Sequence, residues 1–510
     1  MLITLKSVLA ALTVASPAIS SAASNHTRYN PAIPGWYSDP SCVLVAERDN
    51  TTFCTSSTFL LTPGLPVHAS KDLSSWKLAS HAISLKSQYP QYDQSLAHID
   101  GIWAATIRYH QGTFYIITIY RKASVDSRLN QGLIFKTTDP YNDQAWSDPI
   151  QYDAKSIDPD LFWDDDGTTY VATAGTYLQI VDLETGTFSE PRQISNGTNA
   201  RGQWWATALS WRSGPEAKNY PTGREMVITP ATWGNGSWPV ISPIRGVESG
   251  WYLPPSRDLP GDGPFVDEGD VVEFEPNSAI PRHFGFWRWP DTAAYAVSPP
   301  GHPNTLRLTP SAMSITAGYE NYTAGYDIGN FILVMRLQTD TMFQYSVDMS
   351  YIPQVADEEA GVTVFLNQGP LNITNSPLVP HFRFLVSGLG SHLEDIPAPS
   401  TMPIPKFWLQ DPIRLIIRST NEMHYVLSAA SSLYPSEEYV IGTAPATVVS
   451  GGDGPFTGSL VGTYATNNGG NGTTPAYVSR WRYQGLAQSI DNGEMVPSRF
   501  IYQNLALSDQ

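Results

Sequence analysis

The chain carries little charge for its length, and most of that charge has one sign. Only 15% of its 510 residues are Asp, Glu, Lys or Arg, and 47 acidic residues outnumber 30 basic ones, so the formal net charge is −17. A protein that binds nucleic acid needs basic patches facing the phosphates. This composition argues against a nucleic-acid partner and is compatible with a neutral ligand.

Long hydrophobic runs are also missing, apart from a short one at the N-terminus. Lys6 precedes the apolar run Val8 to Ala15, and the small residues Ser20 to Ala23 follow it, so residues 1–23 resemble a secretory signal peptide. No later apolar run reaches the ~18 residues that a membrane-spanning helix needs. We therefore expect a secreted, extracellular, soluble protein without a membrane partner.

Cysteine is scarce, since the chain holds only Cys42 and Cys54. They flank Arg48-Asp49-Asn50, a predicted turn between two extended runs, so a cross-strand disulfide is permitted by the compartment and by the pairing geometry. Two free, buried thiols are the alternative. Glycosylation sequons suit the same compartment, although sequons also arise by chance; they begin at Asn25, Asn50, Asn196, Asn235, Asn321, Asn372 and Asn471.

Amphipathic helical periods are absent from residues 24–262, and short strands take their place. A Gln111-Gly112 turn separates two strand-like segments, residues 107–110 and 113–117, which predicts a β-hairpin. An Asp166-Gly167 turn separates residues 161–163 from residues 168–171 and predicts a second hairpin. The two hairpins are alike, which is the weak self-similarity expected of propeller blades. The acidic residues before Gly167 lack the later acid of a calcium loop, so no metal site is predicted there.

Gly261-Asp262-Gly263-Pro264 is a predicted linker, and residues 263–510 have a different texture. Residues 413–418 and 477–483 are strands with one apolar or aromatic face, and Gly-rich turns separate such strands. This half of the chain is a predicted β-sandwich, so the chain as a whole is predicted to be all-β.

Residues 30–41, N-P-A-I-P-G-W-Y-S-D-P-S, place one carboxylate, Asp39, inside a frame of rigid and aromatic residues. The prolines fix backbone angles, and Trp36 offers a flat face on which a sugar ring could rest. The alternative is an ordinary Pro-rich loop in which Asp39 initiates a turn. The many Trp and Tyr residues of the chain leave the same choice open, because aromatic residues also fill the cores of large β-sheets.

The stretch around Asp39 resembles the opening motif of glycoside hydrolase family 43, whose P-G-x-Y-x-D-P Asp is the general base. Asp158, in S-I-D-P-D-L-F, resembles the second catalytic acid of that family, which orients the general acid and tunes its pKa. Trp103, in G-I-W-A-A-T-I-R-Y, resembles a Trp that lines the sugar pocket, with Ala105 where the family usually has Pro. Arg224, in G-R-E, resembles an Arg that reaches the substrate. The alternatives are a strand-initiating turn for Asp158 and a buried carboxylate pair for Arg224.

The resemblance continues into the second half of the chain. Residues 358–365 and 456–465 resemble the concanavalin-A-like, jelly-roll domain that follows the propeller in one branch of family 43. The resemblance implies a five-bladed-type β-propeller at residues 24–262 and this sandwich at residues 263–510. It also implies an inverting O-glycosyl hydrolase, a β-xylosidase or α-L-arabinofuranosidase that removes terminal pentose from xylan, arabinoxylan or arabinan without any metal or cofactor.

One family segment is missing. The family carries Glu-Gly-Pro-His, whose Glu is the general acid, where this chain passes from N-G-T-N directly to A-R-G-Q-W-W, as though about one blade had been removed. No general acid is found among the other glutamates: Glu184 and Glu190 lie in a turn-rich strand pair, Glu216 lies in a loop, and Glu225 matches a family position with another role. Three hypotheses follow: a working glycosidase or an imperfect gene model of one, a sugar-binding pseudoenzyme, and a secreted β-rich structural protein.

Overall fold

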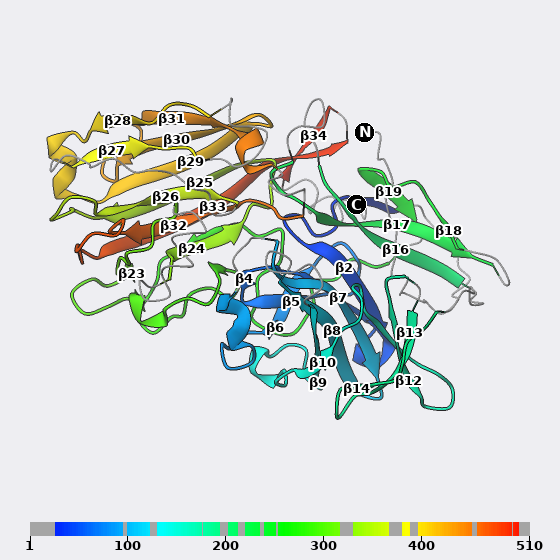
Figure 1. Ribbon diagram of the computed structural model, residues 1–510. Coiled ribbons are helices and arrows are strands. Elements are labelled where there is room, and N and C mark those ends of the chain that lie inside the picture. The colour runs from blue at the N-terminus through cyan, green and yellow to red at the C-terminus, as the bar shows by residue number, and fades with distance from the viewer. Residues whose placement is uncertain are drawn as a thin grey trace.

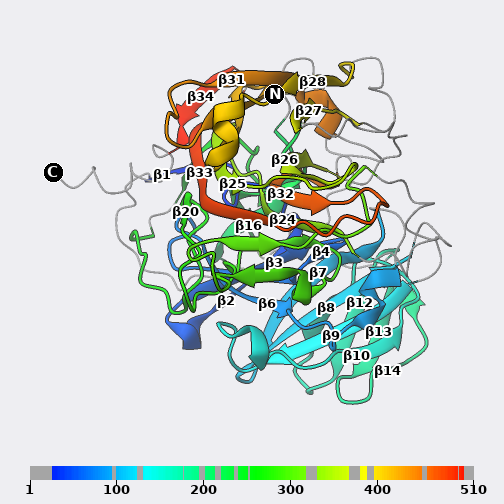
Figure 2. The same cartoon turned by 90° about the vertical axis from the view of Figure 1, so that its left-hand side faces the viewer.

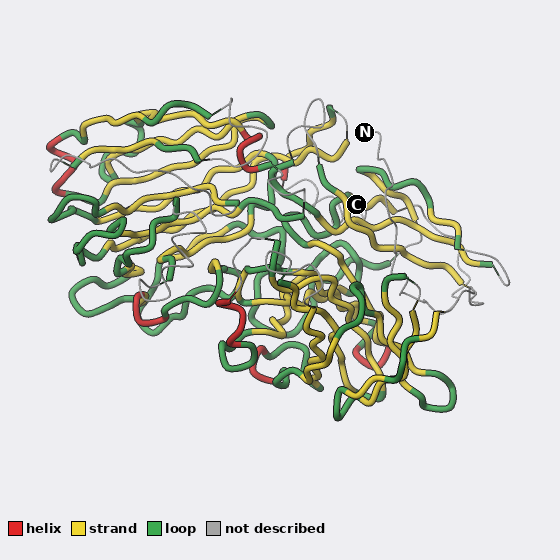
Figure 3. The backbone as a smooth tube through the Cα atoms, in the orientation of Figure 1, coloured by secondary structure: helices red, strands yellow, loops and turns green. Residues whose placement is uncertain are grey.

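The computed structural model describes residues 26–94, 99–122, 130–175, 177–193, 202–212, 220–234, 239–250, 253–316, 330–366, 380–387, 396–450, 456–491 and 493–498. Strands dominate these residues (Figure 3), and the prediction of an all-β protein is confirmed. Short 3-10 helices interrupt the strands at Ala46–Arg48 (η1), Pro90–Gln94 (η2), Asp143–Ala145 (η3), Thr292–Ala294 (η5), Lys406–Gln410 (η7) and Ala446–Val449 (η8). No helix in the described ranges is long and apolar enough to cross a membrane. The predicted signal peptide and the sequons at Asn25, Asn196, Asn235, Asn321 and Asn372 lie outside the described residues.

Four sheets of three or more strands follow one another in the described part of the N-terminal half. The first contains β2 (Ser38–Val45), β3 (Thr51–Ser57), β5 (Gly64–Ser70) and β6 (Lys77–Ile83). The second contains β7 (Gly101–His110), β8 (Thr113–Arg121), β9 (Asn130–Thr137) and β10 (Ile150–Asp153). The third contains β11 (Asp160–Trp163), β12 (Thr169–Thr173), β13 (Tyr177–Asp182), β14 (Thr187–Phe188) and β15 (Arg192–Gln193). The fourth contains β16 (Gly202–Ser210), β17 (Glu225–Trp233) and β18 (Val240–Ile241), and β1 (His26–Tyr29) pairs separately with β19 (Val247–Gly250).

The first strands of these sheets lie near one another (Figure 1). Strand β2 packs against β7 and β16, and β7 also packs against β11. Blades of a propeller are arranged in this way, with their first strands around a common axis. The number of blades, and the loss of one, stay predictions.

Local turn chemistry explains the hairpins that the sequence predicted. Strands β7 and β8 pair from His110 to Thr113 through Gln111 and Gly112, which both have positive φ, as a tight two-residue hairpin turn requires. The predicted hairpin around Gly167 is formed by β11 and β12. Cys42 and Cys54 are opposite each other on β2 and β3 and are joined in a disulfide.

The C-terminal half is a sandwich of two main sheets (Figures 1 and 2). The larger follows the order β22 (Tyr295–Val297), β23 (Leu306–Leu308), β33 (Ala476–Asp491), β25 (Met342–Ser350), β29 (Ile413–Asn421), β30 (His424–Ser431) and β31 (Tyr439–Pro445), and β20 (Asp270–Val272) and β34 (Glu494–Pro497) pair with β33. The smaller contains β24 (Ile332–Leu337), β32 (Leu460–Thr466) and β26 (Glu359–Phe365), and β27 (His381–Phe384) pairs with β28 (Ser400–Pro403). Both sheets contribute to one apolar core, which includes Val334, Tyr345, Val461 and Trp481. The two strands predicted around residues 413–418 and 477–483 are β29 and β33.

The two halves of the chain are joined through a continuous core. Strand β4 (Leu61–Thr62) of the first half pairs with β21 (Phe286–Trp287) of the second. The predicted linker runs along β6, where Leu78 N donates a 3.0 Å hydrogen bond to Pro264 O. One hydrophobic cluster contains both Phe53 and Met335. One core therefore extends across residue 262, and the domain boundary there stays a prediction.

Candidate active site

Asp39 lies in an irregular stretch of β2 that turns its side chain out of the regular ladder. The pairing with β3 shifts register between Ser38 and Ser41, and Asp39 has φ 53°. Pro40 has no N–H to donate to a ladder, and Asp is one of the few residues that tolerate a left-handed backbone. Bulges of this kind re-aim side chains beside active sites. The Asp39-Pro40 pair therefore suits the irregular backbone of β2 at this point.

The Asp39 carboxylate is half-buried and held at both oxygens. Ser57 Oγ donates to Asp39 Oδ2 at 2.9 Å, and Arg224 Nη1 lies 3.1 Å from Oδ1. Ser57 Oγ also accepts the backbone N–H of Ala104 at 2.7 Å, which links β2, β3 and β7. The carboxylate of Asp39 keeps 28% of its side-chain surface exposed. It is therefore oriented but still reachable by water.

Arg224 is positioned by both halves of the chain. Its guanidinium carbon lies 4.2 Å from the centre of the Phe456 ring, and Phe456 belongs to the sandwich half. Gly223 has φ +64°, and a Cβ there would lie 2.4 Å from Thr457 O, so only glycine allows this approach. The buried Nε of Arg224 has no hydrogen-bond partner in the structure. The Arg224 side chain as a whole keeps 19% of its surface exposed beside the base, so its terminal N–H groups are suited to a sugar hydroxyl.

Asp158 repeats the local geometry of Asp39. It also precedes a proline, also has a positive φ, 57°, and leads into β11. Burial raises the pKa of the Asp158 carboxyl, and the negative charge of Asp39 raises it further, while Arg224 and Arg121 act in the opposite direction. Asp39, Asp158, Arg224 and Arg121 thus share one electrostatic environment.

Trp103 lies at the edge of this group and is partly exposed. Its Nε1 donates to Ile99 O at 2.7 Å, and the guanidinium of Arg121 lies 4.6 Å from its ring centre. Trp103 also packs on Phe59, with ring centres 5.8 Å apart. The Trp103 indole is therefore held in place and is linked to the group through Arg121.

Trp36 differs from Trp103. It is only 3% exposed, belongs to the large shared core and packs on Phe59 at 5.8 Å. The structure therefore supports the core alternative for Trp36 rather than an open face for sugar. Burial could not be read from the sequence, because the same aromatic residue serves either purpose.

Three of the four glutamates weighed as general acids lie within the described residues, and each of the three is paired or exposed. Glu225 is 1% exposed and paired with Arg212, whose Nε lies 2.6 Å from Oε2. Glu184 is exposed and paired with Lys136, and Glu190 is exposed. Glu216 lies outside the described residues.

Sequence reasoning missed three residues of the site: Ser57, Arg121 and Phe456. Ser57 and Arg121 end β3 and β8 without any local motif to mark them. Phe456 lies in a segment quoted only for its resemblance to the sandwich, and no signal in that segment places it beside Arg224.

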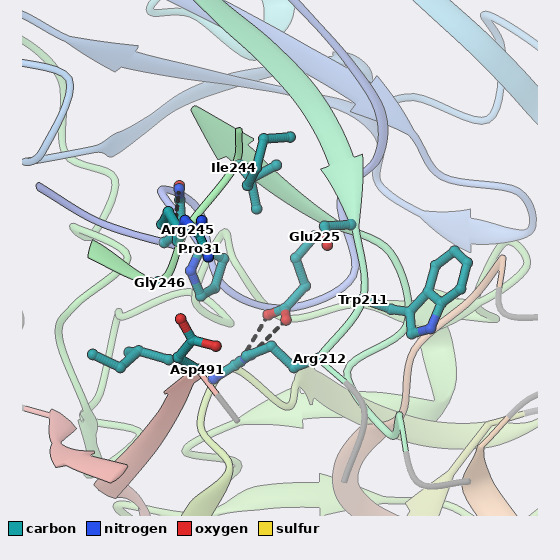
Figure 4. A pocket seen from close by; sticks show the side chains of 12 residues that line it. Pro31, Trp211, Arg212, Glu225, Ile244, Arg245, Gly246 and Asp491 are labelled. Atoms are coloured by element: carbon teal, nitrogen blue, oxygen red, sulfur yellow. Dashed lines mark hydrogen bonds and ion pairs between the residues drawn. The ribbon is translucent and has the colours of Figure 1, made fainter. Parts of the chain in front are cut away.

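A separate pocket lies behind Glu225 (Figure 4). It is lined by residues of the N-terminal half and by the end of β33, including Pro31, Trp211, Arg212, Glu225, Ile244 and Asp491. Neither carboxylate of the candidate site lines it. This pocket and the candidate site around Asp39 and Asp158 are therefore different places.

Two family models match the chain. The model of Glycosyl hydrolases family 43 matches residues 29–196, and that of the Beta xylosidase C-terminal Concanavalin A-like domain matches residues 271–484. The first match ends just before the place where the Glu-Gly-Pro-His segment is missing.

Known proteins agree with these matches. The chain is 26% identical to the Non-reducing end alpha-L-arabinofuranosidase BoGH43B of Bacteroides ovatus over 88% of this chain and 93% of that protein. It is 31% identical to the Xylosidase/arabinosidase 43B of Humicola insolens, over 33% of each chain. Among solved structures, the BlXynB protein of Bacillus licheniformis has a TM-score of 0.71 at 20% identity and a xylan beta-1,4-xylosidase of Bacillus halodurans has 0.66 at 20%; both alignments cover 90% of this chain and 100% of the other.

The two matched models follow one another along the chain, and the Bacteroides ovatus relative aligns with nearly all of it. The chain belongs to glycosyl hydrolase family 43 and carries the concanavalin A-like domain of its β-xylosidases.

Proposed function

We propose that this glycoside hydrolase removes a terminal xylose or arabinose from xylan, arabinoxylan or arabinan, with Asp39 as the general base. The observation that carries the proposal is the arrangement of Asp39, which Ser57 and Arg224 hold at its two oxygens while it remains open to water. A carboxylate so held can take a proton from an attacking water. The names of the relatives, arabinofuranosidase and xylosidase, support the choice of a pentose.

The other residues of the site have complementary roles in this proposal. Arg224 donates to sugar hydroxyls, Trp103 offers a face to the ring, and Asp158 tunes and orients the general acid. Inversion needs ~6.5–9.5 Å between the two reacting carboxyls, so that water fits between the base and the sugar. The acid must therefore come from the wall of the site opposite Asp39. No step of this hydrolysis requires a cofactor.

A second candidate function is a sugar-binding protein with little turnover. Among the described glutamates discussed above, Glu225 and Glu184 are paired and Glu190 is exposed, and the alignment with the Bacteroides ovatus relative supports a shortened chain. That alignment spans 536 positions, which exceeds the 510 residues available, so it contains gaps in this chain. A chain that keeps the base and the binding residues but lacks the acid would bind sugars and hydrolyse natural glycosides slowly.

Leaving-group chemistry separates the two functions. General acid assistance is worth ~10²–10⁴-fold, and a nitrophenolate leaves with little need of a proton. The test compares turnover of a nitrophenyl pentoside with turnover of arabinoxylan by the 510-residue product, with Asp39→Asn as the control. If the acid is lacking, the loss is confined largely to arabinoxylan, whereas full activity on arabinoxylan that Asp39→Asn abolishes supports the complete enzyme. Turnover that Asp39→Asn leaves unchanged would contradict the role of Asp39.

We also propose that the protein is secreted. The N-terminal pattern of residues 1–23 supports this, as do the Cys42–Cys54 disulfide and the exposed sequons at Asn50 and Asn471. N-terminal sequencing of the protein from the culture medium should begin near residue 24. Retention inside the cell with an intact Met1 would contradict secretion.

A further inference from the structure

Arg212 and Glu225 form a closely fitted ion pair behind the candidate site (Figure 4). Arg212 Nε lies 2.6 Å from Glu225 Oε2, and Arg212 Nη2 donates to Oε1 at 2.8 Å, so the contact is bidentate. Thr222 Oγ1 adds a third hydrogen bond to Oε2 at 3.1 Å. Since the carboxylate is almost fully buried, this geometry has little freedom.

The same carboxylate holds the chain segment that leads to Asp39. The backbone N–H of Gly35 donates to Glu225 Oε1 at 2.6 Å. Two residues later, the N–H of Tyr37 donates to the carbonyl of Arg224 at 2.8 Å. Glu225 also follows Arg224 directly in the sequence. Glu225 is therefore linked both to the segment that carries Asp39 and to the backbone of Arg224.

The sandwich half holds the other side of the pair. Arg212 Nη1 donates to Thr341 Oγ1 at 3.0 Å and to Gln488 Oε1, and Nη2 donates to Thr339 O at 3.2 Å. Gln488 is in turn fixed by its own donors, which reach Thr339 O at 3.0 Å and Asp340 Oδ1 at 2.9 Å. Arg212 thus connects β33 and the turn after β24 to the segment that carries Asp39.

We propose that the Arg212–Glu225 pair positions Asp39 and Arg224, so that docking of the sandwich sets the geometry of the catalytic site. Neither residue of the pair touches the reacting groups; both act through Gly35 and through the backbone of Arg224. This role rests on the proposed function of Asp39 as the base. It also explains why a buried ion pair is kept at this joint, where an apolar pair would fill the space but could not accept the Gly35 N–H.

The experiment replaces Arg212 by Met, which keeps an unbranched apolar stem but lacks the charged fork at its end. Arg414 and Asp348 provide a matched control, because Nε and Nη2 of Arg414 contact the two oxygens of Asp348 at 2.6 and 3.0 Å within the sandwich, away from Asp39. Arg212→Met and Arg414→Met should both lower the melting temperature. Only Arg212→Met should lower kcat on a nitrophenyl pentoside, by about 10–100-fold, because small displacements of a catalytic group cost that much.

Two more variants exclude a general loss of structure. Arg212→Lys keeps one charged donor toward Glu225 and should restore part of kcat. Gln488→Met removes one of the three sandwich acceptors of Arg212, together with the hydrogen bonds from Gln488 to Thr339 and Asp340, and should lower kcat less than Arg212→Met. In an Asp39→Asn background, Arg212→Met should cost little further activity, because both changes act through the same carboxylate.

The outcomes are distinguishable. If Asp39→Asn leaves turnover unchanged, the proposed base is wrong; if Asp39→Asn abolishes turnover and Arg212→Met behaves like Arg414→Met, the positioning role is wrong. If the protein turns over no substrate, the same variants are compared by Trp fluorescence titration with xylobiose and arabinobiose. Arg212→Met should then weaken sugar binding by about tenfold. In an Arg224→Ala background, Arg212→Met should cause no further loss of affinity. Equal affinities for the Arg212→Met and Arg414→Met proteins would overturn the proposal.

Discussion

Asp270 is a buried carboxylate whose loss should destabilise the protein more than any surface change. It is 5% exposed, and its oxygens accept from Arg336 Nη1 at 2.9 Å and from Trp481 Nε1 at 3.0 Å, while His283 Nε2 lies 2.8 Å away. Arg336 is itself buried and stacks on Tyr483 at 3.7 Å. Asp270→Asn keeps the shape but leaves the Arg336 charge unpaired.

The expected cost follows from that unpaired charge. Removing one partner of a buried ion pair costs about 3–5 kcal/mol, because the remaining charge stays buried without compensation. For a unit of about 150–250 residues, 1 kcal/mol shifts Tm by ~2–4 °C, so the midpoint should fall by roughly 6–20 °C at pH 7. Circular dichroism during heating measures it, with the exposed turn residue Asp165→Asn as a control that should shift Tm very little.

The effect should depend on pH in a defined direction. Burial by itself would raise the pKa of Asp270, but the charge of Arg336 and the contact with His283 outweigh it and lower the pKa from 3.8 to about 2. A carboxyl with a lowered pKa in the folded state stabilises the protein above its unfolded pKa and loses that contribution as pH falls through the folded value. The difference between the wild type and Asp270→Asn should therefore be full above pH 4 and shrink toward pH 2. A difference below 1 °C at pH 7, or one that does not shrink in acid, would refute this reasoning.

Four further changes test the site. Trp36→Ala should cost about 3–5 kcal/mol in urea unfolding because Trp36 fills the shared core. Trp103→Ala should instead leave the unfolding transition in place and weaken pentose binding in a titration; loss of the transition would identify Trp103 as a core residue. Asp158→Asn should lower turnover but raise Tm at pH 7, because burial and the charge of Asp39 raise the pKa of Asp158 and make its ionised form unfavourable in the folded protein. The gain in Tm should vanish below pH 3.8, where the carboxyl is protonated in both states. A gain in Tm that persists below pH 3.8 would contradict this explanation. Phe456→Ala should raise KM through Arg224, by about fivefold if the lost cation–π contact is worth ~1 kcal/mol, and an unchanged KM would exclude the contact from binding.

Local chemistry made much of this structure predictable. The hairpin between β7 and β8 depends on Gln111 and Gly112 alone, and the all-β architecture depends on strand patterns of a few residues. The family resemblance, confirmed by the matched models, brought Asp39 and Arg224 to attention, but their contact spans 185 residues of sequence and no local rule places them 3.1 Å apart.

The unpredicted features are those that cross between the halves of the chain. Phe456 reaches Arg224 only because the sandwich docks on the N-terminal sheets, and a single core extends across the predicted boundary. Trp36 and Trp103 occupy similar aromatic motifs, and only packing separates the buried ring from the partly exposed one. The role of Glu225 was equally hidden, because its partner Arg212 belongs to no motif.

The missing acid leads to a prediction about the transcript. Strand β15 ends at Gln193 and β16 begins at Gly202, so the Asn199–Arg201 junction lies between two sheets, outside the described residues. An insert of about 40–50 residues there, the length of one blade, would interrupt no described strand. It would add a carboxylate and leave the strands that carry Asp39 and Ser57 uninterrupted. Reverse transcription across the junction should therefore yield an in-frame insert that encodes Glu-Gly-Pro-His, and the protein with the insert should hydrolyse arabinoxylan ~10²–10⁴-fold faster than the 510-residue chain. A transcript that matches the 510-residue chain, together with slow hydrolysis and intact sugar binding, would instead establish the sugar-binding function.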